Sequence, residues 1–582
     1  MTSTRVLNQA GGALGLTLFL LVGCNAIVGL DKIQVTDTPA DSAGSSSGGQ
    51  PNGDGGTGGK GGSSDAGKGA TTDPQAGEGG MAGEVDRGDC TTNQECTDRL
   101  SESAMGEAGA NSVVAAACIK SPIPHCVKLL SEDCDGITGD YTNEQAIFVG
   151  SLFSTKGPTA ATNLQRQRAA ALGIEQINTA GGVPGGNTSA NPRPLVMVSC
   201  DESTNLVRAA SHLVNELHVP AIVGPNTSQD TLDVSTKVSV PGGTVVMSPT
   251  GVASSIAALS DNDLTWLMVP SDVQRAPLMI NQIGVLETQL KADRAVKVIK
   301  LGIVFRNDAL GIGTRTALND LMINGKSLAG NENVQISPYN GADADQQALV
   351  DKYLSFLPDI IVLAGTAESI TKVLVPLEAQ WPKNGSEQDL TPRPYYVLID
   401  SNRVPELTAA ATNNTHDLAK RVRGTGLNSG PTGSDSAVTY NGFLVDYGVR
   451  YNGESAMNAS GTGPAHDAAY AIGLALAATH TEPVTGASVA AGLRRLAGGP
   501  TKIEATGTNV LPAFQKLAAG EKITAIGTFG ALDWDANGAV LGGTLEMWCI
   551  GGTAAKPAYA SSGLLFDLKT QTISGTYVPC TP

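Results

Sequence analysis

The stretch that decides the fold is IFVGSLFSTKGPTAATNLQRQRAAALGIEQINTAGG, residues 147–182. It opens with a short apolar run, Ile147 to Leu152, which predicts a buried strand. After the loop 154–158, apolar residues recur at helical spacing, and the pair Gly181-Gly182 is a helix stop signal. The recurring positions are Leu164, Ala171, Leu172, Ile174 and Ile177. The stretch therefore predicts a strand, a loop and an amphipathic helix.

The next segments repeat this pattern. A strand is expected at 194–199, a helix at 205–217 and a strand at 221–223, which ends in Gly224-Pro225-Asn226-Thr227-Ser228. Strands that alternate with helices of ten or more residues form right-handed crossovers and a parallel sheet. Ligands of such sheets bind at the carboxyl ends of the strands. We therefore expect the functional site at those strand ends.

Five stretches, in order and without large gaps, resemble type I periplasmic binding proteins of the branched-chain amino-acid group. The resemblance runs from about Ala146 to Val540. The five stretches are VGSLFSTKGPTAATNLQRQRAAALGIEQINTAGGVPGG, LVNELHVPAIVGPNTSQDT, FLPDIIVLAGTAESITKVL, HDAAYAIGLALAA and GTFGALDWDANG.

The resemblance implies an α/β fold of two doubly wound parallel-sheet lobes, joined by a hinge in which the chain crosses three times. The N-terminal lobe is expected from residues 143–269 and 427–525, and the C-terminal lobe, with an extension, from 270–426 and 526–582. In the second lobe we expect a helix at 314–323. Such a hinge supports lobe closure around a ligand.

The N-terminus has the features of a lipoprotein signal peptide, residues 1–23. Arg5 supplies a positive charge, the apolar run that follows is too short to span a bilayer, and Leu21-Val22-Gly23-Cys24 resembles a lipobox. We expect Cys24 to carry the lipid; the alternative is an uncleaved or ordinary signal. Residues 24–88 are rich in Gly and Ser with few aliphatic residues, which predicts a flexible tether.

The chain has nine cysteines, so eight remain once Cys24 is set aside. An even number in an exported protein favours disulfides over a metal site, and no C-x-x-C pair occurs. Five of the eight lie in 89–142, which predicts a small disulfide-stapled module in which one cysteine either pairs outside the module or stays free. We expect Cys134 to pair with Cys200, and Cys549 with Cys580.

The resemblance places three ligand contacts in the first lobe. Ser228 matches the family serine that holds a ligand carboxylate, and Thr250 and Gly251 match positions that offer backbone groups. An N-cap role explains Ser228 equally well. Val252 departs from the family, which has serine or threonine there.

The second lobe departs further from the family. Leu310 and Thr366 replace two tyrosines, and no glutamate stands where the family binds the ligand's ammonium; Asp400 and Ser401 are the nearest candidates. A buried ammonium without a carboxylate partner is unfavourable. We therefore expect leucine, isoleucine and valine to bind weakly.

Other motifs point away from an enzyme. No G-x-S-x-G or H-E-x-x-H sequence occurs, and the histidines are scattered. Residues 533–538 imitate a calcium loop, but a hairpin turn at Asn537-Gly538 fits better. His466 is expected on the surface of the first lobe. No metal or cofactor is predicted.

The net charge of −17 argues against nucleic acid as a partner. We expect a lipid-anchored component of the cell envelope, at the outer membrane or on the periplasmic face. Its predicted role is substrate binding for an ABC importer, with a small, polar, amino-acid-like solute held between the lobes and an ABC permease as partner. The alternative is an outer-membrane sensor or scaffold lipoprotein without an importer.

Overall fold

The structure is a computed structural model that describes residues 89–108, 113–185, 191–386, 388–431, 433–479 and 483–580. The predicted signal peptide 1–23, the lipidation site Cys24 and the tether 24–88 lie outside these residues. Within the described ranges, no helix is long and apolar enough to cross a membrane.

The first lobe is built on a six-stranded sheet in the order β3-β5-β4-β6-β7-β8. All neighbouring strands run parallel except β3, which is antiparallel to β5. This arrangement confirms the predicted parallel sheet, and it adds an edge strand from inside the segment 89–142. The strands are β3 (Cys134–Thr138), β4 (Ile147–Phe153), β5 (Leu195–Asp201), β6 (Ala221–Val223), β7 (Val245–Ser248) and β8 (Thr265–Leu267).

Helices cover both faces of this sheet. One face packs against α2 and the C-terminal helices of the lobe, and the other against α3 and α4 with the π-helical turns that follow each of them. A two-stranded parallel sheet of β16 and β17 lies beside the C-terminal helices. The bounds are α2 (Ala160–Thr179), α3 (Leu206–Ser211), α4 (Ser228–Val234), α5 (Val240–Gly242), α6 (Ser254–Ala257), α14 (Ser436–Arg450), α15 (Thr462–Thr479), α16 (Gly486–Leu493), β16 (Thr501–Glu504), α17 (Val510–Ala518) and β17 (Ile523–Ile526).

Helix α15 lies in the centre of the first lobe, and the prediction for His466 was wrong. Every residue of α15 from Thr462 to Ala478 is buried, so this helix has no solvent face. His466 is only 1 % exposed, and its Nε2 lies 3.0 Å from Oε1 of Gln176. Its ring also packs against those of Phe443 and Tyr470. His466 is therefore a hydrogen-bonded core residue.

The second lobe contains an eight-stranded sheet in the order β12-β9-β13-β14-β15-β18-β19-β20. The first five strands are parallel, and the last three continue the sheet in antiparallel fashion. The predicted C-terminal extension is thus part of this sheet. The strands are β9 (Leu301–Arg306), β12 (Val334–Tyr339), β13 (Ile360–Ala364), β14 (Tyr395–Leu398), β15 (Val422–Leu427), β18 (Thr544–Thr553), β19 (Lys556–Asp567) and β20 (Thr572–Ser574).

Helices α7 and α8 cover one face of the second sheet, and α9 to α13 lie on the other. The predicted helix 314–323 was misplaced: α8 begins earlier because Asp308 caps it, accepting a hydrogen bond from the N–H of Gly311. A hairpin, β10 (Met322–Ile323) and β11 (Lys326–Ser327), turns at Asn324-Gly325, both at positive φ. The helices are α7 (Asp272–Asp293), α8 (Ala309–Ala317), α9 (Gln347–Phe356), α10 (Ala367–Ser369), α11 (Val375–Ala379), α12 (Pro405–Ala411) and α13 (Leu418–Arg421).

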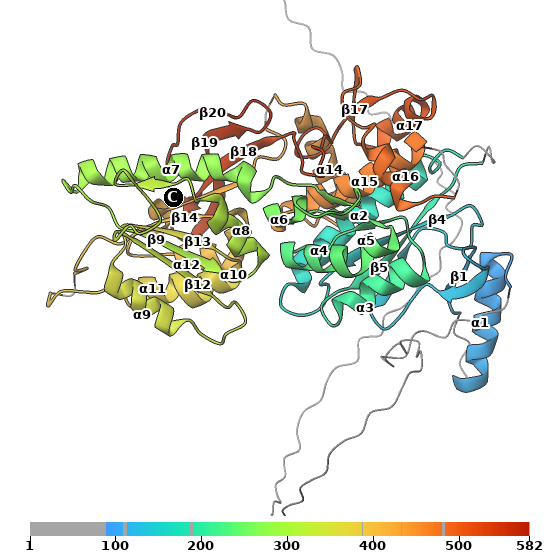
Figure 1. Ribbon diagram of the computed structural model, residues 1–582, viewed down its shortest axis with the longest axis horizontal. Helices are drawn as coiled ribbons and strands as arrows, with labels where there is room; N and C mark the ends of the chain where they lie inside the picture. The colour runs from blue at the N-terminus through green and yellow to red at the C-terminus, as the bar shows by residue number, and fades with distance from the viewer. Residues whose placement is uncertain are drawn as a thin grey trace, which may run out of the picture. The chain divides into compact units, whose positions relative to one another are not determined.

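The chain passes between the lobes three times, as predicted. It leaves the first lobe after β8, returns between β15 and α14, and leaves again between β17 and β18. In Figure 1, the green and yellow elements from α7 to α12 and the red strands β18 to β20 form one lobe. The cyan helices and strands form the other lobe, together with the orange helices α14 to α17.

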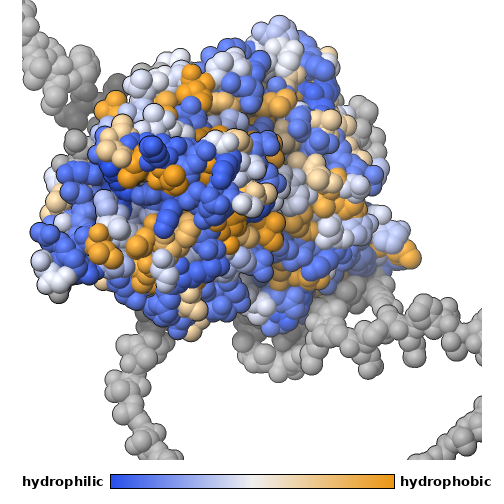
Figure 2. All heavy atoms as spheres, turned by 60° about the vertical axis from the view of Figure 1, so that its left-hand side comes forward, coloured by the Kyte–Doolittle hydropathy of each residue, from blue (hydrophilic) through white to orange (hydrophobic). Residues whose placement is uncertain are grey.

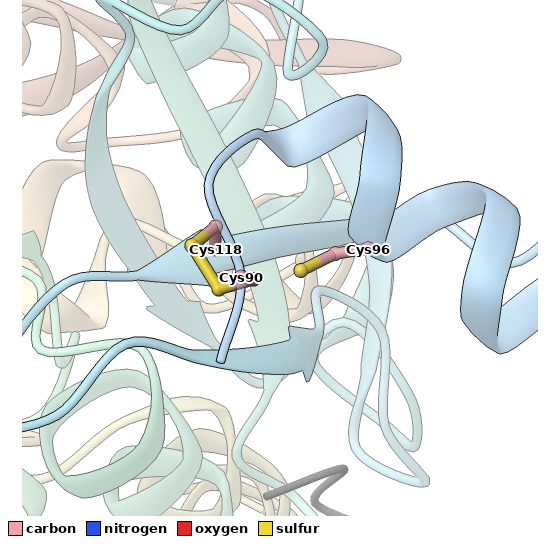
Figure 3. A group of neighbouring side chains, drawn as sticks. All are labelled: Cys90, Cys96 and Cys118. Atoms are coloured by element: carbon pink, nitrogen blue, oxygen red, sulfur yellow. A yellow bond between two sulfur atoms is a disulfide. The ribbon is translucent and has the colours of Figure 1, made fainter. Parts of the chain in front are cut away.

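The segment before the first lobe is stapled by disulfides. Helix α1 (Asn93–Ala108) packs on the hairpin of β1 (Ala116–Ile119) and β2 (His125–Lys128). Cys90 is joined to Cys118 and Cys96 to Cys126, and Figure 3 shows the Cys90–Cys118 bridge with Cys96 beside it. The sulfur atoms of Cys90, Cys96 and Cys118 lie within 4.8 Å of one another, but each belongs to a disulfide and is not a thiolate ligand.

The remaining two disulfides confirm the predicted pairs. Cys134 is bonded to Cys200, which ties the edge strand β3 to β5, and Cys549 is bonded to Cys580, which ties the C-terminal segment to β18. All eight cysteines that follow Cys24 are therefore paired.

The surface is mixed in character. Figure 2 brings the second lobe forward and shows apolar side chains singly or in small groups among hydrophilic ones. The large hydrophobic clusters are instead buried in the interiors of the two lobes.

Candidate functional site

A cavity of about 460 Å³ is lined by residues of both lobes. Its wall contains residues that lie beyond the carboxyl ends of strands in each sheet, as the parallel topology predicts. Ser154 follows β4, Ser228 lies beyond β6, Thr250 follows β7, Thr366 lies beyond β13 and Asp400 lies beyond β14. Five of the six predicted ligand contacts, Ser228, Thr250, Thr366, Asp400 and Ser401, therefore line one cavity.

Ser228 is the first residue of α4, but it is not the N-cap. Thr227 is the N-cap, because its side chain accepts a hydrogen bond from the N–H of Asp230. The Oγ of Ser228 instead accepts hydrogen bonds from the N–H groups of Val252 and Ala253, at 3.0 and 3.2 Å. Its own hydroxyl proton remains available for an acceptor in the cavity.

The other two predicted contacts of the first lobe differ from each other. Thr250 lines the cavity, and its hydroxyl donates to the backbone oxygen of Asn226 at 2.6 Å. Gly251 is not among the lining residues, and its N–H is donated to Oγ of Ser248. Thr250 thus faces the cavity, whereas the amide of Gly251 supports the loop behind it.

Arg166 is a cavity residue that the sequence analysis missed. It lies on α2 and is only 8 % exposed. Its Nε and Nη2 donate to the backbone oxygen and Oγ of Ser460, and its Nη1 donates to Oδ1 of Asn163. Among the described residues, no carboxylate lies within 4.0 Å of this guanidinium. Burial lowers the pKa of Arg166 to about 10, although the charges of Asp400 and Glu202 oppose the shift.

Gly461 explains how the chain passes so close to this arginine. Its φ is +83°, a conformation that favours glycine. An added Cβ would lie 2.2 Å from Cγ2 of Thr250 and 3.2 Å from Nε of Arg166. The glycine therefore lets the segment before α15 pack against both cavity residues.

The polar groups of the second-lobe wall are largely engaged with one another. The hydroxyl of Ser401 donates to the backbone oxygen of Gly365 at 2.8 Å. Thr366 accepts a hydrogen bond from Nη1 of Arg306 and donates to Glu368. Burial raises the pKa of Glu368, but the Thr366 hydrogen bond and the Arg306 charge outweigh it and leave this pKa below its usual value.

Asp400 forms an ion pair within the cavity wall. Its Oδ2 lies 3.6 Å from Nη1 of Arg275, and both side chains are mostly buried. Arg275 also donates from Nε to the backbone oxygen of Pro270. The carboxylate predicted to be nearest to a ligand ammonium is therefore already beside a cation.

Asp272, the first residue of α7, is a second carboxylate in the wall that the sequence analysis missed. Its N–H donates to the backbone oxygen of Val252 in the first lobe, and its Oδ1 accepts from Thr314 of α8. Its Oδ2 is buried without a hydrogen-bond partner among the described residues. Burial raises the pKa of Asp272 to about 7, against the opposing effects of Arg275 and Thr314.

An apolar recess continues the cavity into the second lobe. Six lining residues belong to the hydrophobic cluster between the sheet and the helices α7 and α8, namely Val252, Val269, Met279, Leu310, Leu318 and Ile399. Leu310 and Val252, two of the three residues that depart from the family pattern, are therefore part of an apolar wall.

The calcium-like motif is a hairpin turn, as predicted. Trp534 and Val540 form an antiparallel bridge, and Gly538 has a φ of +73°. Oδ1 of Asp535 accepts hydrogen bonds from the N–H groups of Asn537 and Ala539. The hairpin contacts the first lobe through Trp534, whose ring lies edge-on to that of Trp266.

No family model matches the chain, and no curated protein matches it in sequence. Solved structures do match it. The substrate-binding protein LivJ of Streptococcus pneumoniae, in complex with isoleucine, has 18 % identity and a TM-score of 0.50, with 72 % of this chain and 99 % of LivJ covered. The leucine-binding protein LivK of Thermotoga maritima has 13 % identity and a TM-score of 0.51, with 71 % and 98 % covered.

A solute-binding protein of an ABC transporter from Rhodopseudomonas palustris, in complex with p-hydroxybenzoic acid, has 12 % identity and a TM-score of 0.52. The match covers 73 % of this chain and 97 % of that protein. These similarities show that the chain has the two-lobed fold of type I periplasmic binding proteins.

Proposed function

We propose that this protein is a solute-binding component of an ABC importer, which traps a small molecule between its two lobes and performs no catalysis. The observation that carries the proposal is the cavity of about 460 Å³ whose wall is supplied by both lobes. Because ligand contacts on the two sides belong to bodies joined by a three-segment hinge, a bound solute favours the closed arrangement.

The structural neighbours support this role. The LivJ and LivK structures are those of amino-acid-binding proteins, and the R. palustris protein was solved with p-hydroxybenzoic acid. Isoleucine and p-hydroxybenzoic acid share a carboxylate and an apolar body. The hydroxyl of Ser228 and the guanidinium of Arg166 are suitable donors for such a group.

Thermal denaturation with a panel of amino acids, amides, short peptides and organic acids tests this function. A ligand that binds only the folded state stabilises it by RT ln(1 + [L]/Kd), which is about 2.7 kcal/mol at one hundred times Kd. We expect at least one solute to raise the melting temperature and to reduce the radius of gyration in solution scattering. If no solute in the panel does either, the trapping function is wrong.

The alternative, a sensor or scaffold lipoprotein without an importer, is favoured by the disulfide-stapled segment before the first lobe. A transport component needs no such addition. Under this alternative, a permease would not co-purify with the protein, whereas an importer component is expected to stimulate ATP hydrolysis by its permease complex when the ligand is present.

We also propose that a lipid on Cys24 anchors the protein in the cell envelope. The support is the lipobox-like sequence Leu21-Val22-Gly23-Cys24. Cys24→Ala is expected to release the protein from membranes or to stall its processing. Unchanged membrane retention of this variant in a fractionation experiment would disprove the anchor.

A further inference from the structure

The two walls of the cavity, one from each lobe, differ in their chemistry. Its first-lobe wall contains a buried guanidinium, Arg166, that has no carboxylate partner among the described residues. Its second-lobe wall contains the apolar recess around Met279 and Leu310. A buried charge without an opposite charge is unfavourable. An anionic group of the ligand would therefore best compensate the positive charge of Arg166.

The hydrogen bonds of Arg166 leave a defined set of donors. A guanidinium has five N–H groups, and three are donated to Ser460 and Asn163. One N–H therefore remains on each of the two terminal nitrogens. Two such N–H groups form a fork that matches the two oxygens of a carboxylate.

An α-ammonium group fits this site poorly. In an α-amino acid the ammonium is one carbon away from the carboxylate, so it would lie beside the guanidinium of Arg166. Asp400, the carboxylate that acts most strongly on Arg166, is already within 3.6 Å of Arg275. The free oxygen of Asp272 is buried, and Gly313 lies so close that a Cβ added there would be 2.1 Å from it.

We propose that the ligand is a monocarboxylate with an apolar body and without an ammonium group, whose carboxylate binds the two free N–H groups of Arg166 and whose body fills the recess beside Met279 and Leu310. This inference rests on the proposed solute-trapping function and specifies its substrate class. Two further carboxylates in or next to the wall have a buried oxygen without a partner among the described residues, namely Glu406 of the wall and Glu202, which accepts a hydrogen bond from Ser154 of the wall, so the test includes ligands with an ammonium.

Titration calorimetry with matched ligands tests the proposal on the unmodified protein. The aromatic set is 3-phenylpropanoate, its amide and L-phenylalanine; the aliphatic set is hexanoate, its amide and L-norleucine. Within a set, the amide removes only the negative charge and the amino acid adds only the ammonium. We expect a carboxylate to bind at least about tenfold more tightly than either of its counterparts, because a hydrogen-bonded charge contributes roughly one decade or more.

Variants of the protein test whether Arg166 causes the tighter binding of carboxylates. Arg166→Met is expected to weaken binding of the carboxylate at least about thirtyfold and to leave the amide unaffected. Arg168→Met is the matched control, since Arg168 lies on the same helix but pairs with Glu454 outside the cavity. If Arg166→Met does not fold, the ratio of carboxylate to amide affinity in the unmodified protein decides the question.

The outcomes separate this inference from the function on which it rests. If an amide or amino acid binds as tightly as its carboxylate, or Arg166→Met binds the carboxylate normally, the substrate class is wrong and solute trapping stands. If neither carboxylate binds while another solute closes the lobes, the substrate class is again wrong. If no solute of any class binds or stabilises the protein, the proposed function fails and this inference fails with it.

Discussion

The hydroxyl oxygen of Ser228 lies 3.0 Å from the backbone nitrogen of Val252, and this hydrogen bond joins the start of α4, which follows β6, to the loop that follows the neighbouring strand β7. The next residue, Ala253, donates to the same oxygen at 3.2 Å. Since the N–H of Asp272 in turn donates to the backbone oxygen of Val252, Ser228 is connected to the start of the second lobe. The serine therefore has a structural role in addition to its predicted contact with a ligand.

The first prediction concerns this serine. Ser228→Ala leaves two buried N–H groups without their acceptor, so we expect the free energy of unfolding to fall by about 1–3 kcal/mol. Ser255→Ala, at an exposed serine nearby, is expected to change it by less than about 0.5 kcal/mol. Chemical denaturation measures both. Equal stability of the two variants would show that the Ser228 hydrogen bonds contribute nothing.

The second prediction concerns Glu378, which is buried beneath the second sheet. Its carboxylate accepts hydrogen bonds from Arg421 at 2.6 and 2.9 Å, from Arg393 at 3.2 Å and from the hydroxyl of Tyr396 at 2.8 Å. Removal of one member of a buried ion pair costs about 3–5 kcal/mol because the other charge is left unpaired.

Glu378→Ala is therefore expected to destabilise the protein by about 3–5 kcal/mol. Asp435→Asn is the control, since Asp435 pairs with Lys502 on the surface and both are 60 % exposed; it is expected to cost less than about 1 kcal/mol. A similar small loss in both variants, measured by urea denaturation, would contradict the structural importance of the Glu378 cluster.

The third prediction concerns the covalent links. Peptide mapping under non-reducing conditions is expected to find the four disulfides described above, with no zinc bound. Replacement of both Cys134 and Cys200 by serine opens a closed loop with a sequence separation of 66 and should destabilise the protein by about 2–4 kcal/mol. Stoichiometric zinc bound through Cys90, Cys96 and Cys118 would disprove the pairing in that segment.

The fourth prediction concerns pH. Burial raises the pKa of Asp272 to about 7, above its ordinary value of 3.8. When the pKa of a carboxyl group is higher in the folded state than in the unfolded state, its protonation stabilises the folded protein. This stabilisation is complete at a pH below the pKa of the unfolded state and is lost as the pH rises through the pKa of the folded state. The unmodified protein should therefore lose stability through Asp272 between about pH 4 and pH 7.

Asp272→Asn removes this contribution. Between pH 4 and pH 8, the free energy of unfolding should fall less in the variant than in the unmodified protein, by an amount on the order of 2–4 kcal/mol. Asp435→Asn, at an exposed site, should retain the unmodified slope. Parallel pH profiles of Asp272→Asn and the unmodified protein would refute a raised pKa at this position.

The location of the site at the strand ends was predictable because the topology follows from the local sequence pattern. Ser228, Thr250, Thr366, Asp400 and Ser401 follow strands whose apolar runs are evident in the sequence, and parallel strands bring their carboxyl ends together. The cysteine pairs were predictable for a similar reason, since Cys134 and Cys200 flank neighbouring elements. The location of the site required only the order of the strands, whereas the choice of the individual residues came from the resemblance to the periplasmic binding proteins.

Arg166 and Asp272 were missed because they lie on helices, where a charged residue is usually on the solvent-exposed face. Arg166 stands two residues before Arg168, whose side chain is 38 % exposed and paired with Glu454. The signal was periodicity, since Arg166 shares a stripe with the buried Ala170, Gly173 and Ile177. The predicted apolar face included Leu164 instead, which is 36 % exposed.

The burial of Asp272 and His466 depends on tertiary packing. An aspartate in the first turn of a helix is a common start signal, and the close approach of Gly313, where an added Cβ would lie 2.1 Å from Oδ2 of Asp272, cannot be inferred from the local sequence. His466 belongs to a helix that is covered on all sides, so its sequence has no polar face from which burial can be inferred.

A crystal structure of the protein with bound 3-phenylpropanoate would show which side chain holds the carboxylate. We expect closed lobes, with the two carboxylate oxygens about 2.7–2.9 Å from Nη1 and Nη2 of Arg166 and the phenyl ring in the recess beside Met279 and Leu310. A carboxylate bound at Arg275 or Arg403 instead, or a ligand held outside the cavity, would contradict this expectation.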